Sequence, residues 1–109
     1  MKDNANENLD ALGVDEIIDL EEFSKKDKEP PKKRRYRIKI DREKYVVNVE
    51  CLTGREILEL AGKKPAEQFQ LRQKFRKGHV EKISLDEKVD FTCRGIEKFV
   101  TIPLDQTEG

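Results

Sequence analysis

Few side chains in this chain are of the types that do covalent chemistry. Its 109 residues include one histidine and two cysteines. His79 stands in a predicted turn next to a glycine, where a solvated imidazole is a better interpretation than a catalytic base. Neither Cys51 nor Cys93 is expected to have a nearby partner that would lower the pKa of its thiol. Ser84 precedes a predicted helical turn and is interpreted as its N-cap. We therefore expect the chain not to be an enzyme.

The same residues do not predict a metal site or a cofactor. The two cysteines are far apart in the sequence, no C-x-x-C motif is present, and only one histidine is available. A zinc site needs about four such ligands at short spacings. Two reduced thiols of this kind are typical of cytosolic proteins. No apolar run is long enough to cross a membrane and no secretory leader is visible, so we expect a cytoplasmic protein without a membrane partner.

The segment after Pro103 has a geometry that suits chemistry at a terminal carboxylate. A polar arm of six residues ends in a glycine, whose missing side chain leaves the carboxylate unhindered. We predict a flexible C-terminal arm over residues 105–109. Counted with Leu104, which connects it to the last strand, the arm comprises Leu104, Asp105, Gln106, Thr107, Glu108 and Gly109.

The formal net charge of zero conceals three different segments. Residues 1–23 carry a net charge of −7, residues 24–37 a net charge of +6, and the remainder a net charge of +1. Segments rich in one sign of charge and poor in apolar residues do not bury enough surface to fold. The sequence therefore predicts a largely disordered charged tail over 1–34. Within it lie an apolar-acidic island at 9–23 and a basic linker at 24–35.

Regular patterns begin at Tyr36. Apolar and charged residues alternate over 36–40 and again over 45–49, which predicts two strands joined as a hairpin. Thr53 and Glu56 have the spacing of a capping box and predict a helix that starts there. Gly62 and the proline that follows it predict where that helix ends.

Three further strands are predicted over 69–75, 80–83 and 96–103, with a short helical turn over 84–87. The resulting order, β-β-α-β-β-β, has a helix long enough to cover one face of a sheet. Order and size together predict an α+β fold of the β-grasp type. In this fold a mixed sheet of four to five strands packs on one helix, and the first and last strands are parallel.

The residues 36–104 resemble the ubiquitin-like family, and more narrowly the bacterial multi-ubiquitin domain. The resemblance lies in YRIKIDREKYVV, LTGREILELAG, SLDEKVDF and GIEKFVTIP. One copy of the module is visible. The resemblance implies a protein modifier that is a substrate of conjugation and not its catalyst. Gly109 would be adenylated, passed to an enzyme cysteine as a thioester, and joined to a target by an isopeptide or ester bond.

The partners implied by this resemblance are an activating enzyme, a conjugating enzyme, a deconjugating metalloprotease and the target proteins. Antiviral defence is the setting that it suggests. One departure concerns the arm, which ends in Glu108-Gly109 where ubiquitin ends in two glycines. The cognate enzyme would have to accept a bulky, negative penultimate residue.

The apolar-acidic island suggests a second role. Its short hydrophobic run flanked by acids is similar to a SUMO-interacting motif, which adds a strand to the edge of a ubiquitin-like sheet. Docking on another copy would give filaments or rings. The docking residues would be Val14, Ile17, Ile18 and Leu20, and the acceptor edge would be Lys44, Val46, Asn48 and Glu50.

Two other functions remain open at this point. A β-grasp sulfur carrier also ends in glycine, although it usually has a second glycine and no long charged tail. A ubiquitin-like interaction module that is never conjugated is the other alternative. The basic block from Lys25 to Arg37 would suit nucleic acid, but its one aromatic residue is Tyr36 and a neighbouring acidic segment can neutralise it, so nucleic acid is an unlikely partner.

Overall fold

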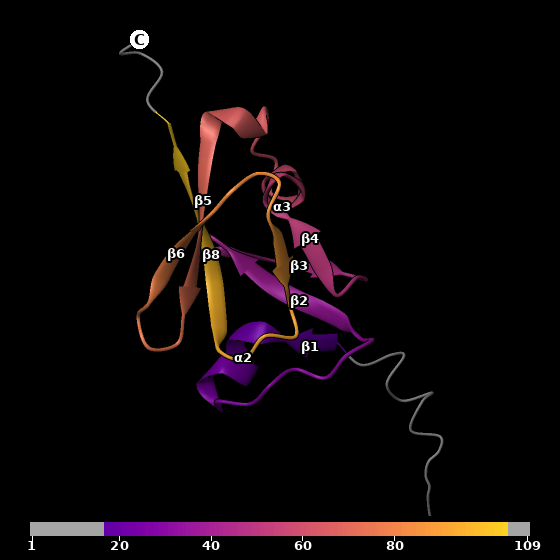
Figure 1. Ribbon diagram of the computed structural model, residues 1–109. Coiled ribbons are helices and arrows are strands. Elements are labelled where there is room, and N and C mark those ends of the chain that lie inside the picture. Colours follow the sequence, from indigo (N-terminus) through magenta and orange to yellow (C-terminus); the bar gives the residue numbers. More distant parts are fainter. Residues whose placement is uncertain (1–16, 105–109) are drawn as a thin grey trace, which may run out of the picture.

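The computed structural model describes residues 17–104 of the chain. Figure 1 shows a twisted sheet with a helix on one side and a shorter helix at one end. The elements in chain order are β1 (Ile17–Asp19), α2 (Leu20–Lys25), β2 (Arg35–Ile40), β3 (Glu43–Val47), β4 (Cys51–Thr53), α3 (Gly54–Leu60), η2 (Ala66–Gln68), β5 (Phe69–Phe75), β6 (Val80–Ile83), β7 (Lys88–Asp90) and β8 (Ile96–Pro103).

Six of these strands form the main sheet. Its order is β1-β2-β8-β5-β6, and β3 pairs with β2 as well. The strands β2 and β8 are parallel and meet at Ile40 and Phe99. The pairs β2–β3, β5–β8 and β5–β6 are antiparallel. A second, two-stranded sheet pairs β4 with β7. The predicted parallel pairing of the first and last strands of the domain is confirmed.

The turn between β2 and β3 is tied to β8 by one side chain. Asp41 occupies the turn with a φ of 57°, a left-handed conformation that aspartate tolerates better than most residues. Its carboxylate accepts hydrogen bonds from the backbone N–H of Thr101 at 2.9 Å and from the hydroxyl of Thr101 at 2.6 Å. The polar turn thereby fixes the hairpin against the last strand.

The helix α3 begins as the sequence predicts. Thr53 accepts from the backbone of Glu56, whose side chain accepts in turn from the backbone of Thr53. The next residue, Gly54, lies against the loop before β7, because a Cβ atom added there would stand 2.4 Å from the carbonyl oxygen of Ser84. Ile57 and Leu58 are completely buried. The helix therefore covers the inner face of the sheet.

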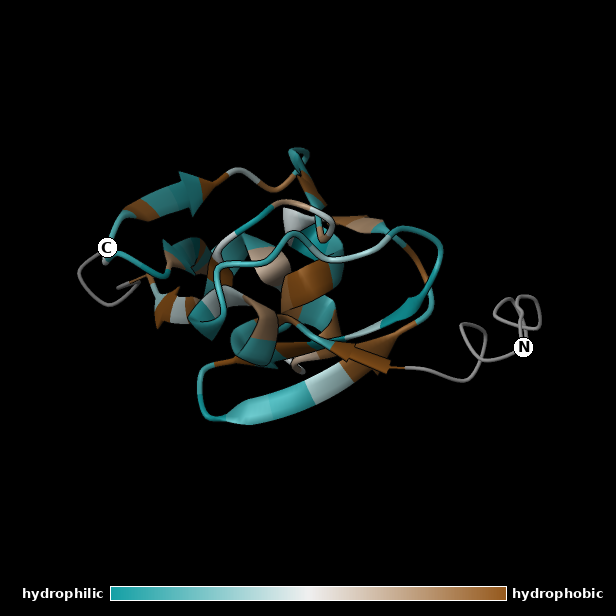
Figure 2. Cartoon of the chain, turned by 90° about the horizontal axis from the view of Figure 1, so that it is seen from below, coloured by the Kyte–Doolittle hydropathy of each residue, from teal (hydrophilic) through white to brown (hydrophobic). Residues whose placement is uncertain are grey.

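The core follows from the alternation in the strands. In β2 every second residue is buried, and in β5 Leu71 and Gln73 are buried while Arg72 between them is exposed. Figure 2 shows hydrophobic segments meeting in the interior and hydrophilic residues along the peripheral loops. Three aromatic rings lie at the centre of the core. The ring centroid of Phe91 is 6.1 Å from that of Tyr36 and 6.4 Å from that of Phe99.

The folded part begins earlier in the chain than the sequence predicts. The strand β1 pairs in parallel with the first half of β2, where Ile18 lies opposite Tyr36. Since β8 pairs with β2 only at Ile40, the two strands diverge toward the N-terminal end of β2. The helix α2 follows β1 and packs against β2 and β8 in this space (Figure 1).

The burial of individual residues shows how far this segment belongs to the core. Ile18 is 1% exposed, Leu20 2% and Ser24 1%. The hydroxyl of Tyr36 donates to the carbonyl of Pro31 at 2.7 Å, which holds the connection to β2 as well. Residues 17–34 were predicted to belong to a tail. They fold instead because their few apolar side chains find a place between β2 and β8, which a count of charges does not reveal.

The architecture is therefore α+β, with a mixed sheet around one main helix, as the sequence predicts. Two details differ. The sheet has six strands because β1 extends it, and residues 84–87 form a turn rather than a helical turn. The remainder of the predicted tail, including the first part of the apolar-acidic island, lies outside the described residues.

Candidate functional site

The end of β8 is the point at which the C-terminal arm leaves the body. Leu104 is the last described residue and is 41% exposed. Its backbone N–H donates to the carbonyl of Gln68 at 2.8 Å, which extends the pairing of β8 with β5 past Pro103. The other arm residues, from Asp105 through Gln106, Thr107 and Glu108 to Gly109, lie outside the described residues. The arm thus starts from a fixed point on the sheet.

A groove of about 310 Å³ lies beside this exit. It runs from the start of β5 to the loop after β6. Its apolar walls are Phe69, Ile83, Leu85 and Leu104, and its polar walls are Glu67, Gln70, Lys82 and Ser84. A macromolecule that holds the arm has this groove within reach of the first arm residue.

The predicted docking motif lies at the other end of β8 (Figure 1). Ile17 and Ile18 are in β1, and Leu20 begins α2. Their hydrogen-bond and packing partners are in β2 and β8 of the same chain. Val14 lies outside the described residues. The motif does add a strand to a sheet, but the sheet belongs to the same chain and not to a second copy.

Carboxylates of this segment neutralise cations on the outer face of β2 and β3. Asp19 lies 2.8 Å from the ammonium of Lys44 and 3.6 Å from the guanidinium of Arg37. Glu21 lies 3.1 Å from Lys44 and 3.5 Å from Lys39. Lys39 and Lys44 stand directly opposite each other in the β2–β3 hairpin. Glu21 therefore bridges two like charges that would otherwise repel each other.

These contacts move the pKa values of the groups in the direction that favours charge. Burial by itself would raise the pKa of Asp19, but hydrogen bonds from Lys44 and from the backbone of Glu22 outweigh it, so the pKa lies below its usual value. Burial and the contacts with Lys44 and Lys39 compete in the same way at Glu21, and its pKa is also lowered. The hydrogen bond to Asp19 raises the pKa of Lys44.

The predicted acceptor edge is only partly a strand. Lys44 and Val46 belong to β3, whose far edge pairs with no other strand among residues 17–104. Asn48 and Glu50 lie after its last residue. Glu50 is engaged within the chain, because its carboxylate accepts from the backbone N–H of Lys33 at 2.6 Å. The free edge of β3 is therefore shorter than the alternation over 45–49 suggests.

The outer face also holds residues that the sequence analysis did not single out. Arg72 and Lys74 of β5 alternate with the buried Leu71 and Gln73, and their side chains point away from the core. They lie beside Lys82 of β6 and Lys98 of β8. The alternation in β5 is visible in the sequence, but the register that brings the four cations together is not.

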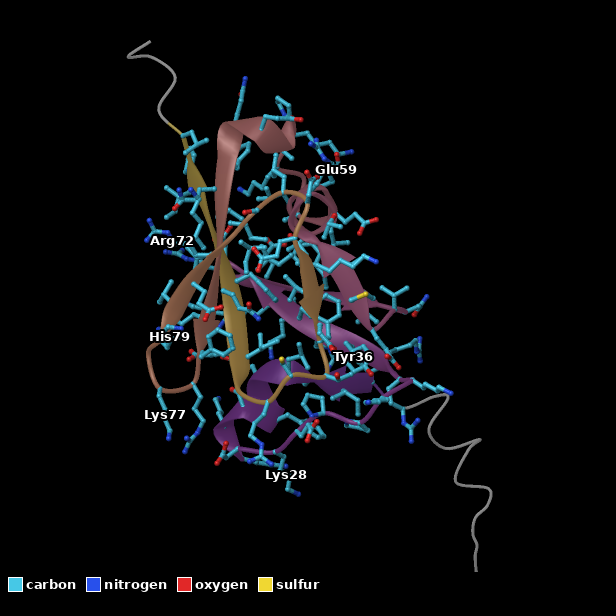
Figure 3. All side chains as sticks on the ribbon, viewed as in Figure 1. Lys28, Tyr36, Glu59, Arg72, Lys77 and His79 are labelled. Carbon is cyan, nitrogen blue, oxygen red and sulfur yellow. The ribbon has the colours of Figure 1, made fainter. Side chains whose placement is uncertain are left out.

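The residues considered first for covalent chemistry do not meet. His79 Nε2 lies 2.9 Å from a carboxylate oxygen of Glu81, and the ring lies tilted at 35° against Phe75 on the exposed hairpin (Figure 3). Both cysteines are exposed. Partial desolvation of the sulfur and nearby carboxylates, Asp90 first among them, raise the pKa of Cys93, so its thiol is a poor nucleophile.

The comparisons with known proteins agree with the fold. A family model described as multiubiquitin matches residues 36–103. No curated protein and no solved structure matches the chain. Within the described residues, no helix is long and apolar enough to cross a membrane. The matched region covers the sheet from β2 to β8 and the helix α3, and leaves β1 and α2 as an addition in front of it. The chain belongs to the multiubiquitin family.

Proposed function

We propose that this protein is a ubiquitin-like modifier that is conjugated through Gly109. The observation that carries the proposal is the family match together with the exit of the arm from the end of β8, where Leu104 is held by Gln68. The chain's own residues supply no catalyst in this reaction. They supply a surface for recognition and a carboxylate for activation.

The chemistry needs ATP and an activating enzyme. The carboxylate of Gly109 attacks the α-phosphate of ATP, which forms the acyl-adenylate and releases pyrophosphate. A cysteine thiolate of the enzyme then displaces AMP to give a thioester. An amine or hydroxyl of the target displaces the thiolate and completes the bond. Glycine suits each attack because it places no Cβ beside the reacting carbon.

The groove beside the exit gives the enzymes a place to hold the body. Leu104, Phe69 and Leu85 are among its apolar lining residues. Apolar side chains in such a groove are typical anchors of an interface. We expect the activating enzyme to insert an apolar side chain here while the arm enters its nucleotide site.

Incubation of the full chain with its cognate activating enzyme and ATP tests this function. We expect a thioester that dithiothreitol cleaves and that the Gly109→Pro variant does not form. Leu104→Ser should slow its formation, whereas Leu60→Ser should not, because Leu60 is exposed to a similar extent on α3. An unmodified chain after this incubation contradicts conjugation. A mass gain that corresponds to replacement of one carboxylate oxygen by sulfur on the isolated protein would assign it instead to sulfur transfer.

Self-assembly through the N-terminal segment is the second part of the proposal. The observation that favours it is the docking of β1 and α2, because contacts made within one chain are also available between two copies. Exchange of residues 17–25 between copies would preserve the pairing of Ile18 with Tyr36 and the ion pairs of Asp19. Each copy then gives its segment to the next, and the assembly closes as a ring or grows as a filament.

Light scattering at increasing protein concentration tests the assembly. We expect a mass above that of one chain, which falls to one chain when residues 1–25 are removed. Because this truncation also removes the buried Ile18 and Leu20, the shortened chain is first shown to be folded by its thermal transition. The Lys44→Glu variant should also lower the mass, because it repels Asp19 and Glu21. A monomeric mass in the full chain at all concentrations contradicts the exchange.

A further inference from the structure

The outer face of β5, β6 and β8 carries four cations in a regular array. Across the three strands, Lys82 stands opposite Arg72, and Arg72 opposite Val100. In the next outward-facing row, Val80 stands opposite Lys74, and Lys74 opposite Lys98. Figure 3 shows the Arg72 side chain projecting away from the sheet. Two pairs of like charge therefore face each other directly.

Such pairs are unfavourable. Like charges placed directly opposite each other across two strands destabilise a sheet. Among residues 17–104, no carboxylate lies within ion-pair distance of Arg72, Lys74, Lys82 or Lys98. The one side-chain hydrogen bond of Arg72 goes to the neutral amide oxygen of Gln70 at 2.7 Å. The repulsion is therefore uncompensated in the described part of the chain.

The opposite half of the same face shows how a carboxylate resolves this problem. Lys39 and Lys44 also form a like-charge pair across two strands, and Glu21 bridges them at 3.5 and 3.1 Å. That carboxylate comes from an apolar-acidic segment, Ile17 to Glu22, which begins by adding a strand to the sheet. Residues 17–104 thus contain one cross-strand pair of cations that a carboxylate bridges and two such pairs without a bridging carboxylate.

We propose that the face formed by β5, β6 and β8 binds an extended acidic segment of a partner protein. The partner's carboxylates bridge Arg72 with Lys82 in one row and reach Lys74 in the next, whereas Lys98 lies one strand further from the β6 edge. Its backbone pairs with β6, the last strand in the sheet order, whose far edge has no partner strand among the described residues. Side chains two positions apart on a strand face the same side. The partner segment therefore carries acidic residues at every second position.

The composition of the face favours a peptide over a nucleic acid. The residues between the cations are Val80 and Val100, and single-stranded nucleic acids require aromatic side chains on which the bases stack. Val80 is 46% exposed and offers an apolar contact to a strand laid along β6. The array is also small, since it spans two rows of side chains.

Titration of the full chain with a fluorescein-labelled octapeptide in which threonine and glutamate alternate tests the proposal. We expect saturable binding that weakens with salt, and amide shifts confined to β6 and the adjacent residues of β5 in a heteronuclear NMR spectrum. Replacing the peptide's glutamates by glutamine should abolish the binding. The double variant Arg72→Gln, Lys82→Gln should raise the Kd by about 3- to 10-fold.

A matched double variant serves as control. Lys64→Gln, Lys88→Gln removes the same charge from exposed positions elsewhere and should leave the Kd unchanged. All substituted side chains of the two variants are exposed, so unfolding is not expected and is checked by the thermal transition of each variant.

Three results overturn the proposal. Equal binding of the glutamate and glutamine peptides removes the electrostatic basis. If a twelve-nucleotide oligothymidylate binds more tightly than the octapeptide, with the same dependence on Arg72 and Lys82, the face binds nucleic acid instead. Peptide binding that occurs only after removal of residues 105–109 assigns the face to the chain's own acidic arm.

Discussion

The carboxylate of Glu21 lies 3.1 Å from the ammonium nitrogen of Lys44. The two residues come from a segment predicted to be a disordered tail and from a hairpin of the predicted domain. The same carboxylate reaches Lys39 on the neighbouring strand at 3.5 Å. An acidic segment and a basic sheet face thus neutralise each other within one chain. Part of the charge balance seen in the sequence is therefore made by direct ion pairs.

Glu21→Gln should loosen the segment without unfolding the body. The substitution removes the bridging charge and leaves Lys39 and Lys44 opposed. The side chains are near the surface, so we expect a loss of about 0.5–1 kcal/mol in urea unfolding. Hydrogen exchange of the β1 amides should accelerate. Glu22→Gln is the control, because the Glu22 side chain is exposed and only its backbone N–H contacts Asp19. An equal effect of both variants would contradict the bridge.

The docking of the segment should depend on pH in a defined window. The pKa values of Asp19 and Glu21 are lowered from their ordinary values of 3.8 and 4.5 by folding. Their contribution to stability is therefore present above those values and is lost as the pH falls through the folded-state pKa. The pKa of Lys44 is raised above 10.5, so its contribution is present below that value and is lost as the pH rises through the raised pKa.

Thermal unfolding between pH 2 and pH 11 measures this dependence. We expect a plateau between the two limits and a fall on both sides of it. In the Lys44→Met variant the alkaline part of this dependence should shrink and the acid limb should move toward the ordinary carboxyl pKa values. An unchanged pH profile in that variant would mean that the ion pairs of Lys44 with Asp19 and Glu21 do not contribute to the stability of the segment.

Leu20→Ala should destabilise the whole protein. Leu20 is 2% exposed and opens α2 in the core between β2 and β8. Truncation of a buried leucine costs about 2–5 kcal/mol through lost contacts and the cavity left behind. Leu60→Ala is the control, since Leu60 is 36% exposed and its truncation should change the free energy of unfolding by about 0.5 kcal/mol or less. A small change in the free energy of unfolding of Leu20→Ala would mean that the segment does not belong to the folded core.

Gly54→Ala should be costly despite the better helix propensity of alanine. The added Cβ would stand 2.4 Å from the carbonyl oxygen of Ser84, so the loop before β7 has to move. That loop also accepts hydrogen bonds from α3, at Leu85 from the backbone of Arg55. We expect a loss of about 1–3 kcal/mol in chemical unfolding. Glu59→Ala, at an exposed position of the same helix (Figure 3), should change stability little.

Lys82→Glu should stabilise the free protein. It replaces a like-charge pair with an opposite-charge pair across β5 and β6, because Lys82 stands opposite Arg72. The expected gain is about 0.2–1 kcal/mol in the free energy of unfolding. The same change should weaken binding of the acidic octapeptide. Lys88→Glu, on β7, should affect neither quantity. A loss of stability in Lys82→Glu would mean that the cations do not oppose each other.

The sequence alone predicts α3 and most strands of the main sheet, but not the second sheet of β4 and β7. Strict alternation over 36–40 predicts the strand that becomes β2, and Thr53 with Glu56 predicts the start of α3. Both signals are local: alternation reports which side of one strand is buried, and a capping box satisfies N–H groups within one turn. The parallel pairing of first and last strands followed from element order, which leaves few ways to cover one helix.

The tertiary structure alone decided the fate of the N-terminal segment and the chemistry of the outer face. Ile18 and Leu20 fold because β2 and β8 diverge next to them, and that space is created by residues distant in the sequence. In the same way, Lys39 meets Lys44, and Arg72 meets Lys82, only through the register of paired strands. Charge composition sums over the chain, whereas repulsion and neutralisation depend on distances of a few ångströms, which the packing of distant elements sets.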